Sequence, residues 1–86
     1  MNISVELTLT PLQDDFEPAI INLIKRLRMS GLTIIENPLS TQVYGDYDTV
    51  MSLLQKEMKT ALMAIENGLL LMKIVKSNRS SYEPHF

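Results

Sequence analysis

Residues 32–46, LTIIENPLSTQVYGD, predict two short β-strands joined by a tight connection. The first strand is expected over residues 32–36. Asn37-Pro38 then predicts a turn, because asparagine tolerates unusual backbone angles and proline cannot continue a hydrogen-bonded ladder. The second strand is expected over residues 40–45, and its first half is polar. Together these features predict an antiparallel hairpin in the middle of the chain.

A helix is predicted before this hairpin, because apolar residues recur there at spacings of three and four. Asp14 or Asp15 is expected to cap its first turn, where Pro18 is tolerated because the first N–H groups have no partner within the helix. Gly31 is expected to end it. The side chains expected to face the core are Phe16, Ile20, Leu23, Ile24 and Leu27.

A second helix is predicted after the hairpin by the same periodicity. Asp46 or Asp48 is expected to cap its start, and Asn67-Gly68 to end it. The side chains expected on its inward-facing stripe are Val50, Met51, Leu54, Met58, Ala61 and Ile65.

Two further strands are predicted near the ends of the chain. Residues 3–10, ISVELTLT, alternate apolar and polar side chains, which is the period of a strand that buries one face. Residues 69–76 are too few for a packed helix and too apolar for a loop, so a fourth strand is expected there. Residues 77–86 show no period and are expected to form a C-terminal tail.

The resulting order is β-α-β-β-α-β, which predicts an α+β fold. The expected architecture is a ferredoxin-like βαββαβ sandwich, with a four-stranded antiparallel sheet and both helices on one face, in a single domain over residues 1–76. The first and third strands are central in this topology. The polar strand over residues 40–45 is therefore expected in the middle of the sheet.

Strand alternation predicts which side chains point away from the helices. Thr41 is expected on the helix side together with Val43, whereas a polar group is expected on the open face, flanked by the apolar side chains of Leu69, Leu71 and Val75. The expected open-face polar residues are Ser4, Glu6, Thr8, Ser40, Gln42 and Tyr44. We expect such a mixed face to pack against another subunit or a ligand.

The role of Glu6 is open at this point. Its carboxylate could accept hydrogen bonds from an aminopyrimidine, or it could form a cross-strand ion pair with Lys73 on the fourth strand. An exposed pair of this kind contributes only about 0.2–1 kcal/mol to stability.

Composition argues against several classes of partner. The net charge is −2, and Lys25, Arg26 and Arg28 are expected mostly on the solvent side of a helix, so we expect no nucleic-acid partner. No apolar run approaches the roughly 20 residues of a membrane span, and no early stretch looks like a secretion signal. We expect a cytoplasmic protein without a membrane partner.

The inventory of reactive side chains is nearly empty. The chain has no cysteine and one histidine, His85, so no metal site is expected. Its three glycines are all explained as ends of elements, which leaves no phosphate-binding loop and no cofactor to predict. A non-enzymatic protein is therefore expected.

Two stretches, ISVELTLTPL at residues 3–12 and SGLTIIENPLSTQVYGDYDTVMSLL at residues 30–54, resemble the YkoF-like thiamine-binding protein family. The resemblance extends over about residues 3–76. It implies a ferredoxin-like subunit that forms homodimers or homotetramers through its sheets and binds thiamine or its hydroxymethylpyrimidine moiety without turning it over. The ligand-binding residues that it implies are Ser4, Glu6, Thr8, Ser40 and Thr41, with Asn37 and Gln42 near them and Tyr44 as an aromatic surface.

Three hypotheses follow. The first is a non-enzymatic carrier or salvage accessory for thiamine or hydroxymethylpyrimidine. The second is a structural or regulatory homo-oligomer, in which the polar strand sets the register between subunits and binds no small molecule. The third is a small enzyme acting on the same class of substrate, with Glu6 as a lone acid or base.

Overall fold

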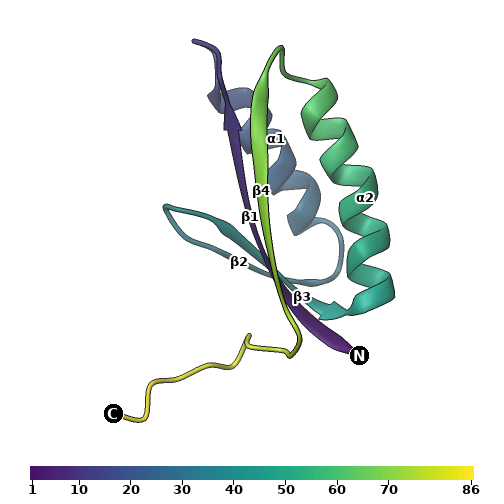
Figure 1. The fold of residues 1–86 in the computed structure, drawn as a ribbon, viewed down its shortest axis with the longest axis vertical. Coiled ribbons are helices and arrows are strands. Elements are labelled where there is room, and N and C mark those ends of the chain that lie inside the picture. Colours follow the sequence, from purple (N-terminus) through teal and green to yellow (C-terminus); the bar gives the residue numbers. More distant parts are fainter.

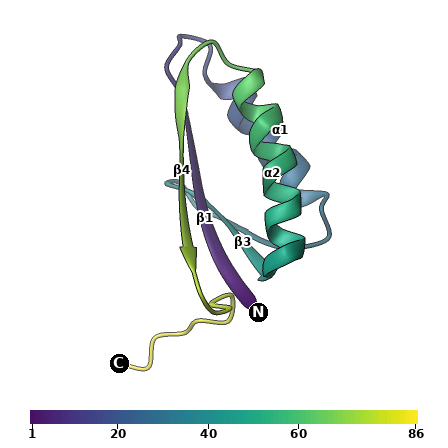
Figure 2. The same cartoon turned by 45° about the vertical axis from the view of Figure 1, so that its right-hand side comes forward.

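The computed structural model describes all 86 residues and has the predicted order of elements. These are β1 (Asn2–Pro11), α1 (Glu17–Arg28), β2 (Thr33–Glu36), β3 (Thr41–Asp46), α2 (Tyr47–Met63) and β4 (Gly68–Val75). The strands form one antiparallel sheet in the order β2-β3-β1-β4. Both helices lie on one face of it (Figures 1 and 2), so the α+β ferredoxin-like fold is confirmed.

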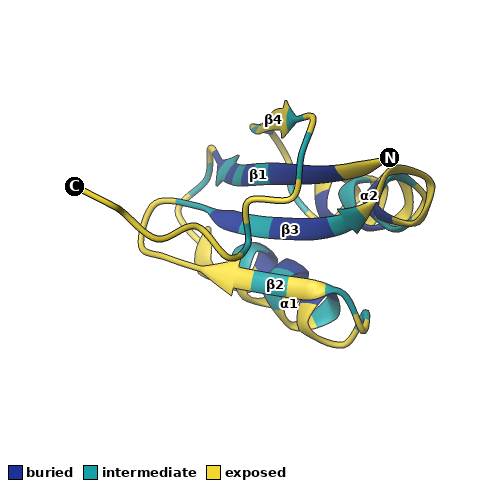
Figure 3. Cartoon of the chain, turned by 90° about the horizontal axis from the view of Figure 1, so that it is seen from below, coloured by how far each residue is buried: buried dark blue, intermediate teal, exposed yellow.

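The core lies between the two central strands and the helices. Val5 and Leu7 of β1 and Val43 of β3 point toward the helices and are buried, as the alternation predicted. Leu27 of α1 and Leu54 of α2 are completely buried against them. Figure 3 shows this distribution, with buried residues in β1 and β3 and mostly exposed residues in β2 and β4.

The start of α1 differs from the prediction. The helix begins at Glu17 with Phe16 in the N-cap position, and no side chain caps it. The expected Asp14 or Asp15 cap is wrong because these residues belong to a bend, in which the Gln13 side chain donates to the Asp15 carbonyl at 3.0 Å. Phe16 is consequently exposed, and Ala19 supplies the first buried position.

The end of α1 also comes early, at Arg28 rather than next to Gly31. Gly31 instead has a φ of +83°, in the left-handed region that glycine adopts without strain, and turns the chain into β2.

The start of α2 is as predicted, because the Asp46 carboxylate accepts a hydrogen bond from the Thr49 N–H at 3.4 Å. The helix ends at Met63, before Asn67-Gly68, and Ile65 follows it. All six predicted stripe residues, Ile65 included, are buried in the core or packed against it. Neither helix of the protein is both long and apolar enough to cross a bilayer.

One charged residue interrupts the inner stripe of α2. Glu57 is only 7% exposed, and its carboxylate accepts a hydrogen bond from the Nε of Arg26 on α1. Arg26 is therefore half-buried between the helices and does not lie on the solvent side of α1 as expected. Arg28 is exposed, and its guanidinium makes two hydrogen bonds of 2.6 Å to the Glu36 carboxylate on β2.

The edge strand β4 is incompletely covered on both faces. Leu69 and Leu71 are 43% and 61% exposed on the open face. Met72 and Ile74, on the helix side, are still 39% and 44% exposed, because α2 does not reach across the edge of the sheet.

Candidate ligand-binding site

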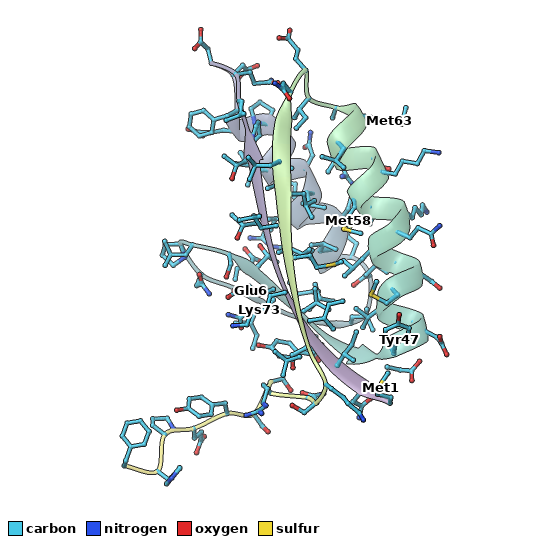
Figure 4. The ribbon with its side chains drawn as sticks, viewed as in Figure 1. Met1, Glu6, Tyr47, Met58, Met63 and Lys73 are labelled. Carbon is cyan, nitrogen blue, oxygen red and sulfur yellow. The ribbon has the colours of Figure 1, made fainter.

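Strand pairing aligns polar side chains across the open face. Gln42 on β3 lies opposite Glu6 on β1, and Glu6 lies opposite Lys73 on β4. In the adjacent row Tyr44 lies opposite Ser4. Since alternate side chains share a face, all five point away from the helices, and Figure 4 shows Glu6 and Lys73 on the side of the sheet remote from α2.

The C-terminal tail folds back over one end of this face. Figure 2 shows the chain leaving β4 and turning to the side away from the helices. The buried Ser4 hydroxyl donates to the Ser77 carbonyl at 2.7 Å and accepts from the Arg79 N–H at 2.8 Å. The Tyr82 N–H then donates to the Arg79 carbonyl at 3.1 Å, which closes a turn. One hydroxyl on β1 thus anchors the tail through both its donor and its acceptor.

A pocket of about 530 Å³ lies between the tail and the sheet. Its volume is in the range of small-molecule sites, about 300–1,000 Å³. The strands contribute Ser4, Val5, Glu6, Ile35, Gln42, Tyr44, Lys73 and Val75 to its lining, and the tail contributes Arg79, Ser80 and Tyr82. The lining combines aromatic and aliphatic surface with a few charged and amide groups, as small-molecule sites do.

Tyr44 is a fixed neutral group at the base of the pocket. Its side chain is buried, and its hydroxyl donates to the Gln42 side-chain oxygen at 2.6 Å. Burial raises the pKa of Tyr44, and the nearby negative charge of Glu6 raises it further. Tyr44 is therefore protonated at neutral pH. Because the Gln42 side-chain oxygen accepts this bond, the Gln42 NH2 group is left to donate to a ligand.

The Glu6 carboxylate keeps one oxygen available. Its Oε2 atom accepts a hydrogen bond from the Ser40 hydroxyl at 3.0 Å, and its Oε1 atom has no partner in the protein. The ion pair considered with Lys73 does not form, although the two residues lie opposite each other. Glu6 instead accepts its hydrogen bond from Ser40, which lies just before β3 at the hairpin.

The remaining predicted residues lie around the hairpin. The Thr8 hydroxyl donates to the Leu39 carbonyl at 3.3 Å, and the Asn37 side-chain oxygen accepts the N–H groups of Leu39 and Ser40, each at 2.9 Å. Thr41 is buried on the helix side, as the alternation predicted. The four predicted residues Thr8, Asn37, Ser40 and Thr41 line a smaller hollow of about 210 Å³ between the hairpin and α1.

The structure therefore divides the eight predicted residues into two groups. Ser4, Glu6, Gln42 and Tyr44 come together in the larger pocket, whereas Thr8, Asn37, Ser40 and Thr41 surround the smaller hollow. The sequence analysis missed the contribution of the tail. Residues 77–86 carry no periodic signal, and hydrogen bonds to the distant Ser4 hydroxyl hold this segment at the site.

Neither a protein-family model nor a curated protein matches this sequence. Solved structures do match it. A protein from Streptococcus pneumoniae has a TM-score of 0.84 at 25% identity, over 94% of this chain and 92% of that one. A Thermotoga maritima protein provisionally assigned to thiamine biosynthesis or salvage has a TM-score of 0.80 at 16% identity, over 90% and 85%. A domain of unknown function from Bacillus cereus reaches 0.75 at 14% identity, over 96% and 83%. These likenesses agree with the fold.

Proposed function

We propose that the protein binds thiamine or its hydroxymethylpyrimidine moiety without turning it over, as a carrier or salvage accessory. The observation that carries the proposal is the pocket over the open face, where Glu6 and Gln42 present an acceptor and a donor beside the Tyr44 ring. The resemblance of residues 3–12 and 30–54 to the thiamine-binding family supports the same ligand, as does the provisional assignment of the Thermotoga maritima neighbour.

An aminopyrimidine suits these groups. Its exocyclic amine is a donor, which the free oxygen of the Glu6 carboxylate can accept, and its ring nitrogens are acceptors, which the Gln42 amide NH2 group can serve. The flat ring needs apolar or aromatic contact on its faces. Tyr44, Ile35 and Tyr82 line the same pocket and offer that contact.

Ligand binding should be measurable as added stability. At a free concentration of 100 times its dissociation constant, hydroxymethylpyrimidine or thiamine is expected to raise the free energy of unfolding by about 2.7 kcal/mol, because it binds the folded chain only. Chemical denaturation with and without ligand measures the difference. Glu6→Gln should lose most of this gain, because an amide replaces the carboxylate that accepts the ring amine.

The control for this experiment is Glu66→Gln, which removes an exposed carboxylate outside the pocket. Its ligand-induced gain should equal that of the wild type. If saturating amounts of thiamine and hydroxymethylpyrimidine both leave the stability of the wild type unchanged, the proposed function is wrong. Ligand recovered chemically unaltered after incubation would favour a binder over an enzyme that uses Glu6.

The exposed apolar surface of β4 favours a second candidate function, a structural or regulatory homo-oligomer. Leu69 and Leu71 extend the open face beyond the pocket, and no part of the chain covers them. Contiguous apolar surface of this kind typically marks an interaction site. A homodimer or homotetramer formed through the sheet would bury it.

We expect sedimentation to show an oligomer at micromolar concentration, and Leu71→Glu to shift it to the monomer, because the substitution places a charge in the middle of the buried contact. Ile21→Glu is the matched control, since Ile21 is 43% exposed on α1, on the other side of the molecule from the open face. A stable wild-type monomer, or equal dissociation by both variants, would contradict an interface on this face.

A further inference from the structure

The charge of the pocket is opposite in sign to that of the whole chain. Three side chains with a formal charge line it, namely Glu6, Lys73 and Arg79. Their formal sum is +1, whereas the net charge of the protein is −2. The pocket thus concentrates two of the eight basic residues of an acidic protein beside a single carboxylate.

Neither basic side chain in the pocket has an acidic partner. The ion pairs of the protein join Met1 to Asp46, Arg26 to Glu57 and Arg28 to Glu36. Lys73 lies opposite Glu6 without pairing to it. Four other lysines are also unpaired, but they lie outside the pocket, so it is the position of Lys73 that distinguishes it.

Arg79 is presented by an ordered segment. Its main chain is held by the Ser4 hydroxyl and by the turn to Tyr82, and its Nε donates to the Ser77 hydroxyl at 2.7 Å. The two terminal nitrogens of the guanidinium make no hydrogen bond within the protein. They therefore remain available as a planar pair of donors, the arrangement that matches phosphate oxygens.

This combination of groups suits free thiamine less well than a phosphate ester, because the thiazolium ring of thiamine carries a positive charge. The two unpaired cations repel that positive charge, and the pocket holds only one carboxylate, Glu6, to offset them. A phosphate ester reverses this balance, because a phosphate monoester carries about −1.5 to −2 charges at neutral pH and offers three strong acceptor oxygens.

We propose that the pocket takes the phosphate ester of an aminopyrimidine ligand in preference to the free alcohol. Lys73 and Arg79 bind the phosphate, and Glu6 and Gln42 hold the ring. The inference rests on the proposed function and deepens it by naming the chemical form of the ligand. It assigns the protein a cargo that a phosphorylating enzyme would supply.

Calorimetric titration of the full chain tests the proposal with five compounds. These are hydroxymethylpyrimidine, its monophosphate, thiamine, thiamine monophosphate and inorganic phosphate. Each ester is expected to bind at least tenfold more tightly than its parent alcohol. This preference should shrink between low salt and about 0.5 M salt, because partly exposed ionic contacts are screened.

Three variants and one control connect this preference to the named side chains. Lys73→Gln and Arg79→Gln should each bring the ratio of ester affinity to alcohol affinity toward one, whereas Lys59→Gln, an exposed lysine of α2 outside the pocket, should leave the ratio as it is. Arg79→Lys should keep part of the preference, because it retains the charge but loses the planar donor pair. Unfolding curves verify that each variant is folded.

The outcomes separate this inference from the proposed function. If the alcohols bind and the esters bind no more tightly, the phosphate preference is overturned while the proposed function stands. If inorganic phosphate binds as tightly as the esters, the inference is also overturned, because the pyrimidine ring then contributes nothing to the affinity. If neither hydroxymethylpyrimidine nor thiamine binds, the proposed function itself fails.

Discussion

Replacing Leu54 with alanine is expected to lower the free energy of unfolding by about 2–5 kcal/mol, the range for removing a leucine side chain from a packed core. Leu54 is completely buried where α2 meets the sheet, and it contacts the core formed by β1, β3 and α1. An 86-residue domain has a single thin core and a total stability of roughly 5–15 kcal/mol. The loss is therefore a large fraction of the whole, and urea denaturation measures it.

The matched control is Leu62→Ala, the same substitution on the same helix at a position that is 44% exposed. It should change the free energy of unfolding far less, because most of its side chain already contacts water in the folded protein. Equal losses for the two variants would mean that α2 does not pack on the sheet through the face that contains Leu54.

The architecture could be predicted because its determinants are local. The alternation in residues 3–10 and the spacing of three and four around Leu23 and Leu54 identify both the element and its buried face. The same alternation correctly placed Thr41 and Tyr44 on opposite faces of β3. Such signals need no knowledge of the rest of the chain.

The wrong predictions concern features set by distant residues or by competing local conformations. Residues 13–15 form a bend, which delays α1 and leaves Phe16 exposed, although the spacing of Phe16 fits the helix. Arg26 has the sequence context of a solvent-exposed residue. Its actual environment depends on Glu57, which lies 31 positions away on another helix.

Only part of the candidate site could be predicted for the same reason. Alternation alone brings Ser4, Glu6 and Gln42 to one face. The wall formed by the tail depends on the hydrogen bonds between Ser4 and the main chain of Ser77 and Arg79, which lie 73 and 75 positions further along the chain. Nothing in the periodicity of residues 77–86 indicates these bonds. A long-range contact between single polar groups leaves no pattern in a sequence.

Replacing Glu57 with alanine is the second substitution for which we expect a large loss of stability. It leaves the half-buried guanidinium of Arg26 without its carboxylate partner, and one terminal nitrogen of that group, Nη2, is already buried without a hydrogen bond. Breaking a fully buried pair in this way costs about 3–5 kcal/mol. Arg26 retains 31% exposure, so water compensates in part, and we expect about 1–3 kcal/mol from urea denaturation.

A double-mutant cycle then separates the pair from its surroundings. Arg26→Met combined with Glu57→Met should recover most of the loss, because two apolar side chains of suitable length fill the space between α1 and α2 with no charge to desolvate. If the double variant loses as much as the two single variants together, the ion pair is not the source of the effect.

The exposed Arg28–Glu36 pair is the control. Glu36→Ala should change the free energy of unfolding much less, because both groups are accessible to water, even though that pair has two hydrogen bonds. Burial, more than the number of hydrogen bonds, then determines how much each pair matters to this fold.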